Sequence, residues 1–192
     1  MQTWPQNCYD LLLHPTAALK RLSERGHWGF AACVLALTTL LHTFTQAGSM
    51  AQALPALFPQ FLVNGMGVFL LWLTFSLMIS LCADLFGGQG RITDTMTGLG
   101  LASLPLIFLA PVSALPNLFG QAGFTLQLLM TLGVGFWVLV LVILGIQSAQ
   151  NFSLDKAIGS LVISGLCGFA LGTLAVLTGV AQMVLSLQLL AG

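Results

Sequence analysis

Long apolar runs separated by short polar segments make up most of this chain. The runs are about twenty residues long, which is the length that a helix needs to cross a bilayer. They lack the alternation of polar and apolar positions that the strands of a membrane barrel show. We therefore predict an all-α polytopic membrane protein with a five-helix transmembrane bundle. The predicted spans cover about residues 28–46, 61–83, 94–115, 124–146 and 157–179.

Residues 1–27 are the only sizeable segment outside the predicted membrane domain of residues 28–192. Pro15 suits the first turn of a helix, and Gly26 suits its end. We expect a short amphipathic helix here, lying on the membrane surface. The alternative is a plain lead-in that only sets the orientation of the first span.

Three apolar segments flank the predicted spans without forming spans of their own. Residues 47–60 contain two prolines and no charge, so we place them in the interface on the far side of the membrane. Residues 116–123 predict a tight link between the third and fourth spans. Residues 180–190 exceed the length of one span, so they either extend the last helix or lie in the interface.

Composition supports the membrane assignment, since 57% of the residues are hydrophobic and only 5% are charged. Soluble domains carry about 25% charged residues, so this surface would not remain in water. The net charge of zero gives no electrostatic case for binding nucleic acid. The four cysteines are scattered, and no disulfide framework or metal site is indicated.

The few basic residues predict the orientation of the chain. With five spans, all five lysines and arginines fall on one side of the membrane, and the five acids fall there too. The positive-inside rule then puts the N-terminus in the cytoplasm and the C-terminus on the other side. The basic residues are Lys20, Arg21, Arg25, Arg91 and Lys156.

The last span carries small residues at steps of three and four, which place them on one helix face. Such residues let helix backbones approach closely in lipid. We expect a tight contact with a helix of this chain, and a second copy is the alternative. The stripe consists of Gly165, Gly168, Gly172, Ala175 and Gly179.

A glycine turn precedes the third span. Gly87, Gly88 and Gly90 lead to Arg91, and Asp94 or the threonine before it is the expected N-cap of the next helix. The turn lacks the Gly-Lys-Ser/Thr ending of a phosphate-binding loop. We interpret it as a cytoplasmic turn that sets the entry angle of the third span.

Two prolines interrupt the third span. Neither Pro105 nor Pro111 can donate a backbone hydrogen bond, so the carbonyls of Leu101 and Ile107 need other partners. Broken helices line substrate sites in transporters. They also occur as plain kinks where neighbouring groups satisfy the backbone, and we favour the kink here.

The predicted spans contain no Asp, Glu, Lys or Arg. Catalysis needs a titratable group near its working pH or a metal ion. We therefore expect no enzymatic activity, no catalytic residues, no metal and no cofactor. The lack of a buried carboxylate also argues against ion-coupled transport.

Several short motifs follow one another in a recognisable order. A His-Pro pair at 14–15 precedes the first helix, a Gly-Gly-x-Gly turn occupies 87–90, and Ala-Ser-Leu-Pro occupies 102–105. A Lys-Ala pair at 156–157 opens the fifth span. In this order they resemble the bacterial branch of the Yip family, membrane proteins named for Rab/Ypt-interacting proteins. The resemblance implies a five-helix protein of the bacterial inner membrane with no known catalytic residue set.

Two functional hypotheses are consistent with this sequence. The first is a non-enzymatic membrane protein that binds another membrane protein or a second copy of itself, as the small-residue stripe indicates. The second is a conduit or binding site for lipid or a small neutral solute, as the broken third span and the uncharged far face indicate. The lipid bilayer is the expected surrounding partner in both.

Overall fold

The computed structural model of the chain describes residues 10–11, 15–24, 28–46 and 50–191. Its described part is mostly helical and contains no strand, which confirms the all-α prediction. Five helices are long and apolar enough to cross a membrane. The elements are α2 (Pro15–Glu24), α3 (Trp28–Gln46), α4 (Met50–Leu85), α5 (Ile92–Ala102), the 3₁₀ helix η1 (Leu104–Phe108), α6 (Leu109–Val112), α7 (Leu115–Gln150) and α8 (Leu154–Ala191).

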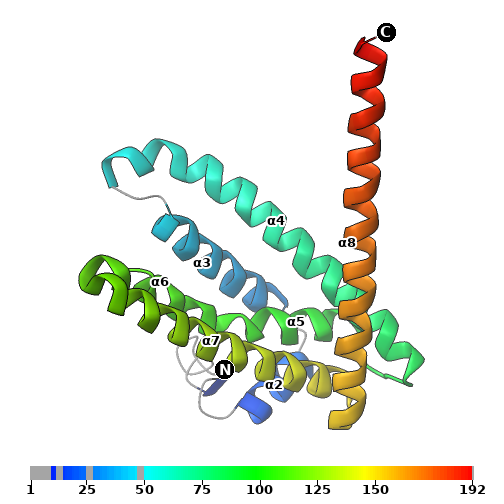
Figure 1. Cartoon of the computed structure of the whole chain (residues 1–192). Helices are drawn as coiled ribbons and strands as arrows, with labels where there is room; N and C mark the ends of the chain where they lie inside the picture. Colours follow the sequence, from blue (N-terminus) through cyan, green and yellow to red (C-terminus); the bar gives the residue numbers. More distant parts are fainter. Residues whose placement is uncertain (1–9, 12–14, 25–27, 47–49, 192) are drawn as a thin grey trace.

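The third span is the centre of the bundle (Figure 1). Helix α5 packs against α7, α3, α4 and α2. In the 18-residue apolar stretch that defines the third span, 56% of the residues are buried, whereas the corresponding stretches of the other four spans have only 17–28% buried. The outer spans thus turn most of their side chains toward the surrounding lipid, and the third span carries the contacts that hold the bundle together.

Glycines explain why α5 can lie at the centre. A Cβ at Gly98 would stand 3.0 Å from the carbonyl oxygen of Gly145 in α7. A Cβ at Gly100 would stand 2.6 Å from the Cβ of Ala31 in α3. These are closer than ordinary van der Waals contacts, so the backbones of three helices approach each other because side chains are missing or small.

The central span changes its helical form at Ser103. Helix α5 ends at Ala102, and Pro105 falls in the first turn of η1. The amide and the hydroxyl of Ser103 both donate to the carbonyl of Gly100, at 3.3 and 2.6 Å. Ser103 therefore serves the carbonyl of Gly100, one residue before Leu101.

Two long helices extend past the boundaries that the sequence suggested. Helix α4 begins at Met50, so most of the 47–60 segment expected in the interface is the first part of that helix. The range of α7, Leu115–Gln150, contains two helical stretches that meet at a kink. The kink is at Gly120, within the expected 116–123 link, where φ is 57° and ψ is −131°, a combination that glycine adopts readily.

Helix α2 buries its apolar face against other helices of the chain. It packs against α7 and α5. Leu19 and Leu22 are 0% and 3% exposed. An ion pair at 3.1 Å between Arg21 and Asp10 closes its outer side. The apolar face is therefore covered by the bundle itself, which is why it does not need the lipid surface to bury it.

Helix α8 crosses the other helices steeply and then continues beyond them (Figure 1). Near its start, Ala157, Ser160 and Ser164 are fully buried, and the helix packs against α4 and α7. From Gly165 onward nearly every described side chain is exposed or half-buried. The helix is unbroken to Ala191, so residues 180–190 continue the last helix rather than forming a separate segment.

Candidate functional site

A buried polar cluster joins three helices and a loop at one end of the bundle. Gln150, the last residue of α7, is 1% exposed. Its Nε2 donates to the hydroxyl of Thr95 at 2.9 Å, and its Oε1 accepts from the amide of Gly90 at 3.0 Å. The hydroxyl of Ser80 donates to the same Thr95 oxygen at 3.2 Å. The side chains of Gln150 and Thr95 together thus connect α7, α5, α4 and the glycine turn.

The glycine turn fits closely around this glutamine. A Cβ at Gly88 would stand 2.6 Å from Oε1 of Gln150. A Cβ at Gly90 would stand 2.0 Å from the carbonyl oxygen of Ala149. Gly87, with φ of 79°, supplies the left-handed turn that ends α4. The three glycines therefore allow the α4–α5 loop to lie against the end of α7.

Arg91 and Asp94 begin α5 in a different way from the one the sequence suggested. The helix starts at Ile92, so Arg91 is the N-cap and Asp94 is the third helical residue. The carboxylate of Asp94 accepts from the amide of Arg91 at 3.1 Å, and the amide of Asp94 donates to the carbonyl of Arg91 at 3.0 Å. The carboxylate of Asp94, inside the first turn, therefore provides the acceptor for the free amide at the start of α5. The side chain of Arg91 is exposed.

The basic residues that the structure describes gather at this end. Lys156 of α8 donates to the carbonyl of Phe86 at 3.0 Å and lies 5.8 Å from the ring centroid of Phe152. Lys20 of α2 lines a small cavity beside Phe152. We call this region, made of α2, the 86–91 loop and residues 150–156, the loop end of the molecule.

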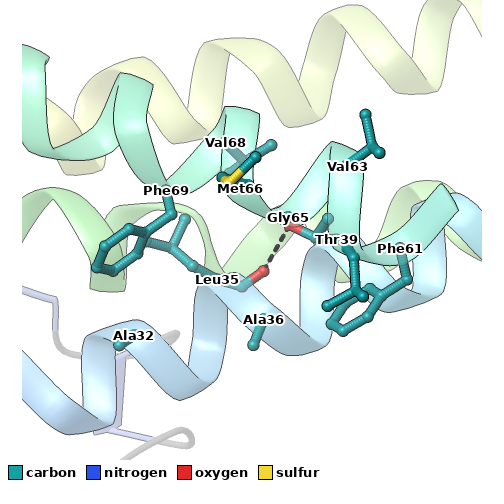
Figure 2. Close-up of a pocket in the computed structure, with 11 residues that line it drawn as sticks. Ala32, Leu35, Ala36, Thr39, Phe61, Val63, Gly65, Met66, Val68 and Phe69 are labelled. Atoms are coloured by element: carbon teal, nitrogen blue, oxygen red, sulfur yellow. Dashed lines mark hydrogen bonds between the residues drawn. The ribbon is translucent and has the colours of Figure 1, made fainter. Parts of the chain in front are cut away.

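An apolar cavity lies away from the loop end, between α3 and α4 (Figure 2). It is a cavity of about 570 Å³. Ala32 and Ala36 form its α3 wall, and Phe61, Gly65 and Phe69 belong to its α4 wall. The hydroxyl of Thr39 turns back to the carbonyl of Leu35 at 2.8 Å, so this wall presents mainly hydrocarbon (Figure 2).

A second cavity of about 590 Å³ adjoins the first, since both are lined by Leu35, Thr39, Val63 and Val68. It extends to η1 and α6, beside the break in the third span. Its polar lining residues are Thr38, Thr39, His42 and Asn64. Asn64 donates to the hydroxyl of Thr43 at 3.4 Å. We call the two cavities together the α3–α4 crevice and the region of His42 and Asn64 its outer rim.

The small residues of the α8 stripe make few contacts with the described part of the chain. A Cβ at Gly165 or at Gly172 would meet no described atom within 4 Å. A Cβ at Gly168 would touch only the end of Met78, at 3.9 Å. Ala175 and Gly179 belong to the part of α8 whose side-chain surroundings lie outside the described residues. The expected tight internal contact is therefore limited to Gly168.

Sequence reasoning missed Gln150 and the α3–α4 crevice. Gln150 lies in a polar segment that the sequence placed beyond the fourth span, although it follows the buried Ile146 by four residues, on the same helix face. That spacing was the available signal. The crevice had no comparable signal, because it depends on which glycines lack a neighbour. In the described part of the chain, no cluster of three His, Cys, Asp or Glu could hold a metal.

Comparison with known proteins gives one match. A family model described as the Yip1 domain matches residues 9–186, which is nearly the whole chain. No curated protein and no solved structure matches this chain.

Proposed function

Because this chain belongs to the Yip1 domain family and carries five helices able to cross a bilayer, we propose that it is a non-enzymatic protein of the bacterial inner membrane. It acts by helix–helix contact with other membrane helices. The observation that carries this proposal is α8, whose described residues after Ser164 contact little of the rest of the chain.

The gathering of Lys20, Arg91 and Lys156 near the loop end supports an orientation with the N-terminus in the cytoplasm. An odd number of spans then puts the C-terminus in the periplasm. Alkaline phosphatase fused after Gly192 should be active, and a fluorescent protein fused there should be dark. A fluorescent fusion with an inactive phosphatase would contradict the orientation.

The occupant we assign to the exposed face of α8 is α8 of a second copy. In lipid, helices associate through close packing of small residues rather than through hydrophobic burial. Gly165 and Gly172 share one face and leave space for a partner backbone. The same face on a second copy is complementary to it, as the two-fold symmetry of a dimer requires.

Cysteine cross-linking in native membranes tests this contact. In a chain whose four cysteines are replaced by alanine, Gly172→Cys should form a disulfide-linked dimer on mild oxidation. The matched control is a chain that keeps only Cys167, which is exposed. Cys167 lies about 200° around the helix from Gly165 and should not cross-link. Equal cross-linking at both positions would indicate random collision.

Bulky substitution gives the second test. Gly172→Leu should convert the dimer to a monomer in mild detergent, as measured by light scattering. Gly133→Leu is the matched control, because a Cβ added at Gly133 of α7 would also meet no described atom within 4 Å. A monomeric wild-type protein in membranes and in detergent would overturn self-association and leave a different membrane protein as the partner to identify.

A further inference from the structure

The α3–α4 crevice exists because the helix faces that border it carry small side chains. Ala32 and Ala36 face it from α3. On α4, a Cβ at Gly65 or at Gly67 would meet no described atom within 4 Å. Two helices that carried larger residues here would fill the space themselves. The cavity therefore depends on alanine or glycine being present at these two positions of α3 and two positions of α4.

The inner end of the crevice is fixed by the core. Phe69, which lines it, packs against Trp72 with 5.5 Å between ring centroids. The indole nitrogen of Trp72 donates to the carbonyl of Met96 in α5 at 3.0 Å. Phe69 is thus connected to the central helix through Trp72.

The crevice lies within two predicted spans and faces the bilayer. Leu62, Val63 and Met66 are 53%, 68% and 65% exposed, and they stand beside it. A water molecule needs two to four polar partners to be stable in such a place, and the first cavity supplies almost none. The medium that reaches this space is therefore hydrocarbon, and the bilayer itself is its source.

Its depth and its polar groups point to one kind of occupant. From Phe61 to Phe69 the helix rises about 12 Å, less than one leaflet of a bilayer whose core is about 30 Å thick. The described residues that line the two cavities include none with a formal charge. Thr38, His42 and Asn64 supply uncharged hydrogen-bonding groups toward the outer rim.

We propose that the α3–α4 crevice is a binding site for one acyl chain of a glycerolipid from the leaflet at the outer rim. The chain end lies against Phe69, and the uncharged ester region lies toward His42 and Asn64. This inference does not depend on self-association through α8, because the crevice is built from other helices. It gives the lipid-site hypothesis a location beside the broken third span, at Leu106 and Leu109.

Fluorescence quenching of Trp72 tests the site in the full-length protein. The other three tryptophans are replaced by phenylalanine, and the protein is reconstituted in phosphatidylcholine vesicles with bromine at the middle or end of the acyl chains. Bromine quenches an indole only at short range. We expect clear quenching of Trp72, which is only 6% exposed and would otherwise be shielded.

Filling the crevice supplies the decisive comparison. Gly65→Leu should abolish most of the quenching, because leucine occupies the space of the chain. Gly133→Leu in α7 makes the same chemical change at an equally open position away from the crevice and should leave quenching unchanged. Gly67→Leu provides a second filling variant in the adjoining cavity.

The outcomes separate the alternatives. Strong quenching that Gly65→Leu and Gly67→Leu both leave intact would mean that bromine reaches Trp72 from the general lipid surface, and it would overturn the site. Absence of quenching in the parent protein would overturn it as well. Native mass spectrometry should agree, with a retained lipid in the wild type and in Gly133→Leu that is lost from Gly65→Leu. A dimer that persists in the wild type and in all three variants separates this result from the test of α8.

Discussion

Glycine has opposite effects at the loop end and in the α3–α4 crevice. At the loop end, Gly88 and Gly90 stand so close to α7 that an added Cβ would overlap Gln150 or Ala149. In the crevice, Gly65 and Gly67 leave space that no described atom fills. The first pair lets backbones approach closely, whereas the second pair leaves a cavity because it has no side chains to fill the space.

The difference shows which region is packed within the protein and which region is open to a ligand. The loop end has satisfied hydrogen bonds through Gln150, Thr95 and Ser80, and its polar groups are used within the protein. The crevice has an apolar wall and few polar contacts, so its surface gains most from an external hydrocarbon chain. Stability and ligand binding should therefore respond to mutations in different parts of the molecule.

The largest effect should come from Gly90→Ala. The added methyl would fall 2.0 Å from the carbonyl oxygen of Ala149, so the loop must move away and break the bond from Gly90 to Gln150. We expect a loss of about 3 kcal/mol in the free energy of unfolding. Thermal unfolding in mild detergent measures it. Gly133→Ala, made in open space, should instead be neutral or slightly stabilising, and equal losses at both sites would contradict the comparison.

Gln150→Leu should have the next largest effect. It removes the acceptor of the Gly90 amide and the donor to Thr95 in a place that is 1% exposed. An unsatisfied buried group costs roughly 1–3 kcal/mol. Gln147→Leu, one turn earlier and half-buried, is the matched control and should change stability by less than about 0.5 kcal/mol. Similar unfolding temperatures for the two variants would show that the hydrogen bonds of Gln150 contribute no more to stability than the side chain of Gln147 does.

A smaller effect is expected at the start of α5. Asp94→Ala removes the carboxylate that accepts from the Arg91 amide and should cost about 1 kcal/mol. Asp155→Ala removes an exposed acid from the first turn of α8, where the helix dipole provides the benefit, and should cost about 0.3 kcal/mol. The two variants can be compared by chemical denaturation. A larger loss at Asp155 would contradict the role we give to the hydrogen bond.

The sequence was sufficient for the number and type of helices because span length depends directly on hydrophobic thickness. Pro105 also stands where the α-helix gives way to η1, since its missing donor acts locally. The position of α2 against α5 and α7 was not predictable in this way, because an amphipathic face fits either lipid or protein. Likewise Gly98 and Gly67 look alike in sequence, and only the neighbouring helix decides that one is packed and the other open.

The smallest effect on stability, and the sharpest separation of the two regions, is expected for Gly65→Leu. The Cβ of the leucine would meet no described atom within 4 Å, and leucine favours the helix over glycine, so stability should stay level or rise by up to about 1 kcal/mol. Lipid retention should fall at the same time. Gly98→Leu is the opposing variant, because it faces the backbone of Gly145 and should destabilise the bundle. If Gly65→Leu also unfolded the protein, the crevice would be a packed contact, and the distinction between closing and opening glycines would fail.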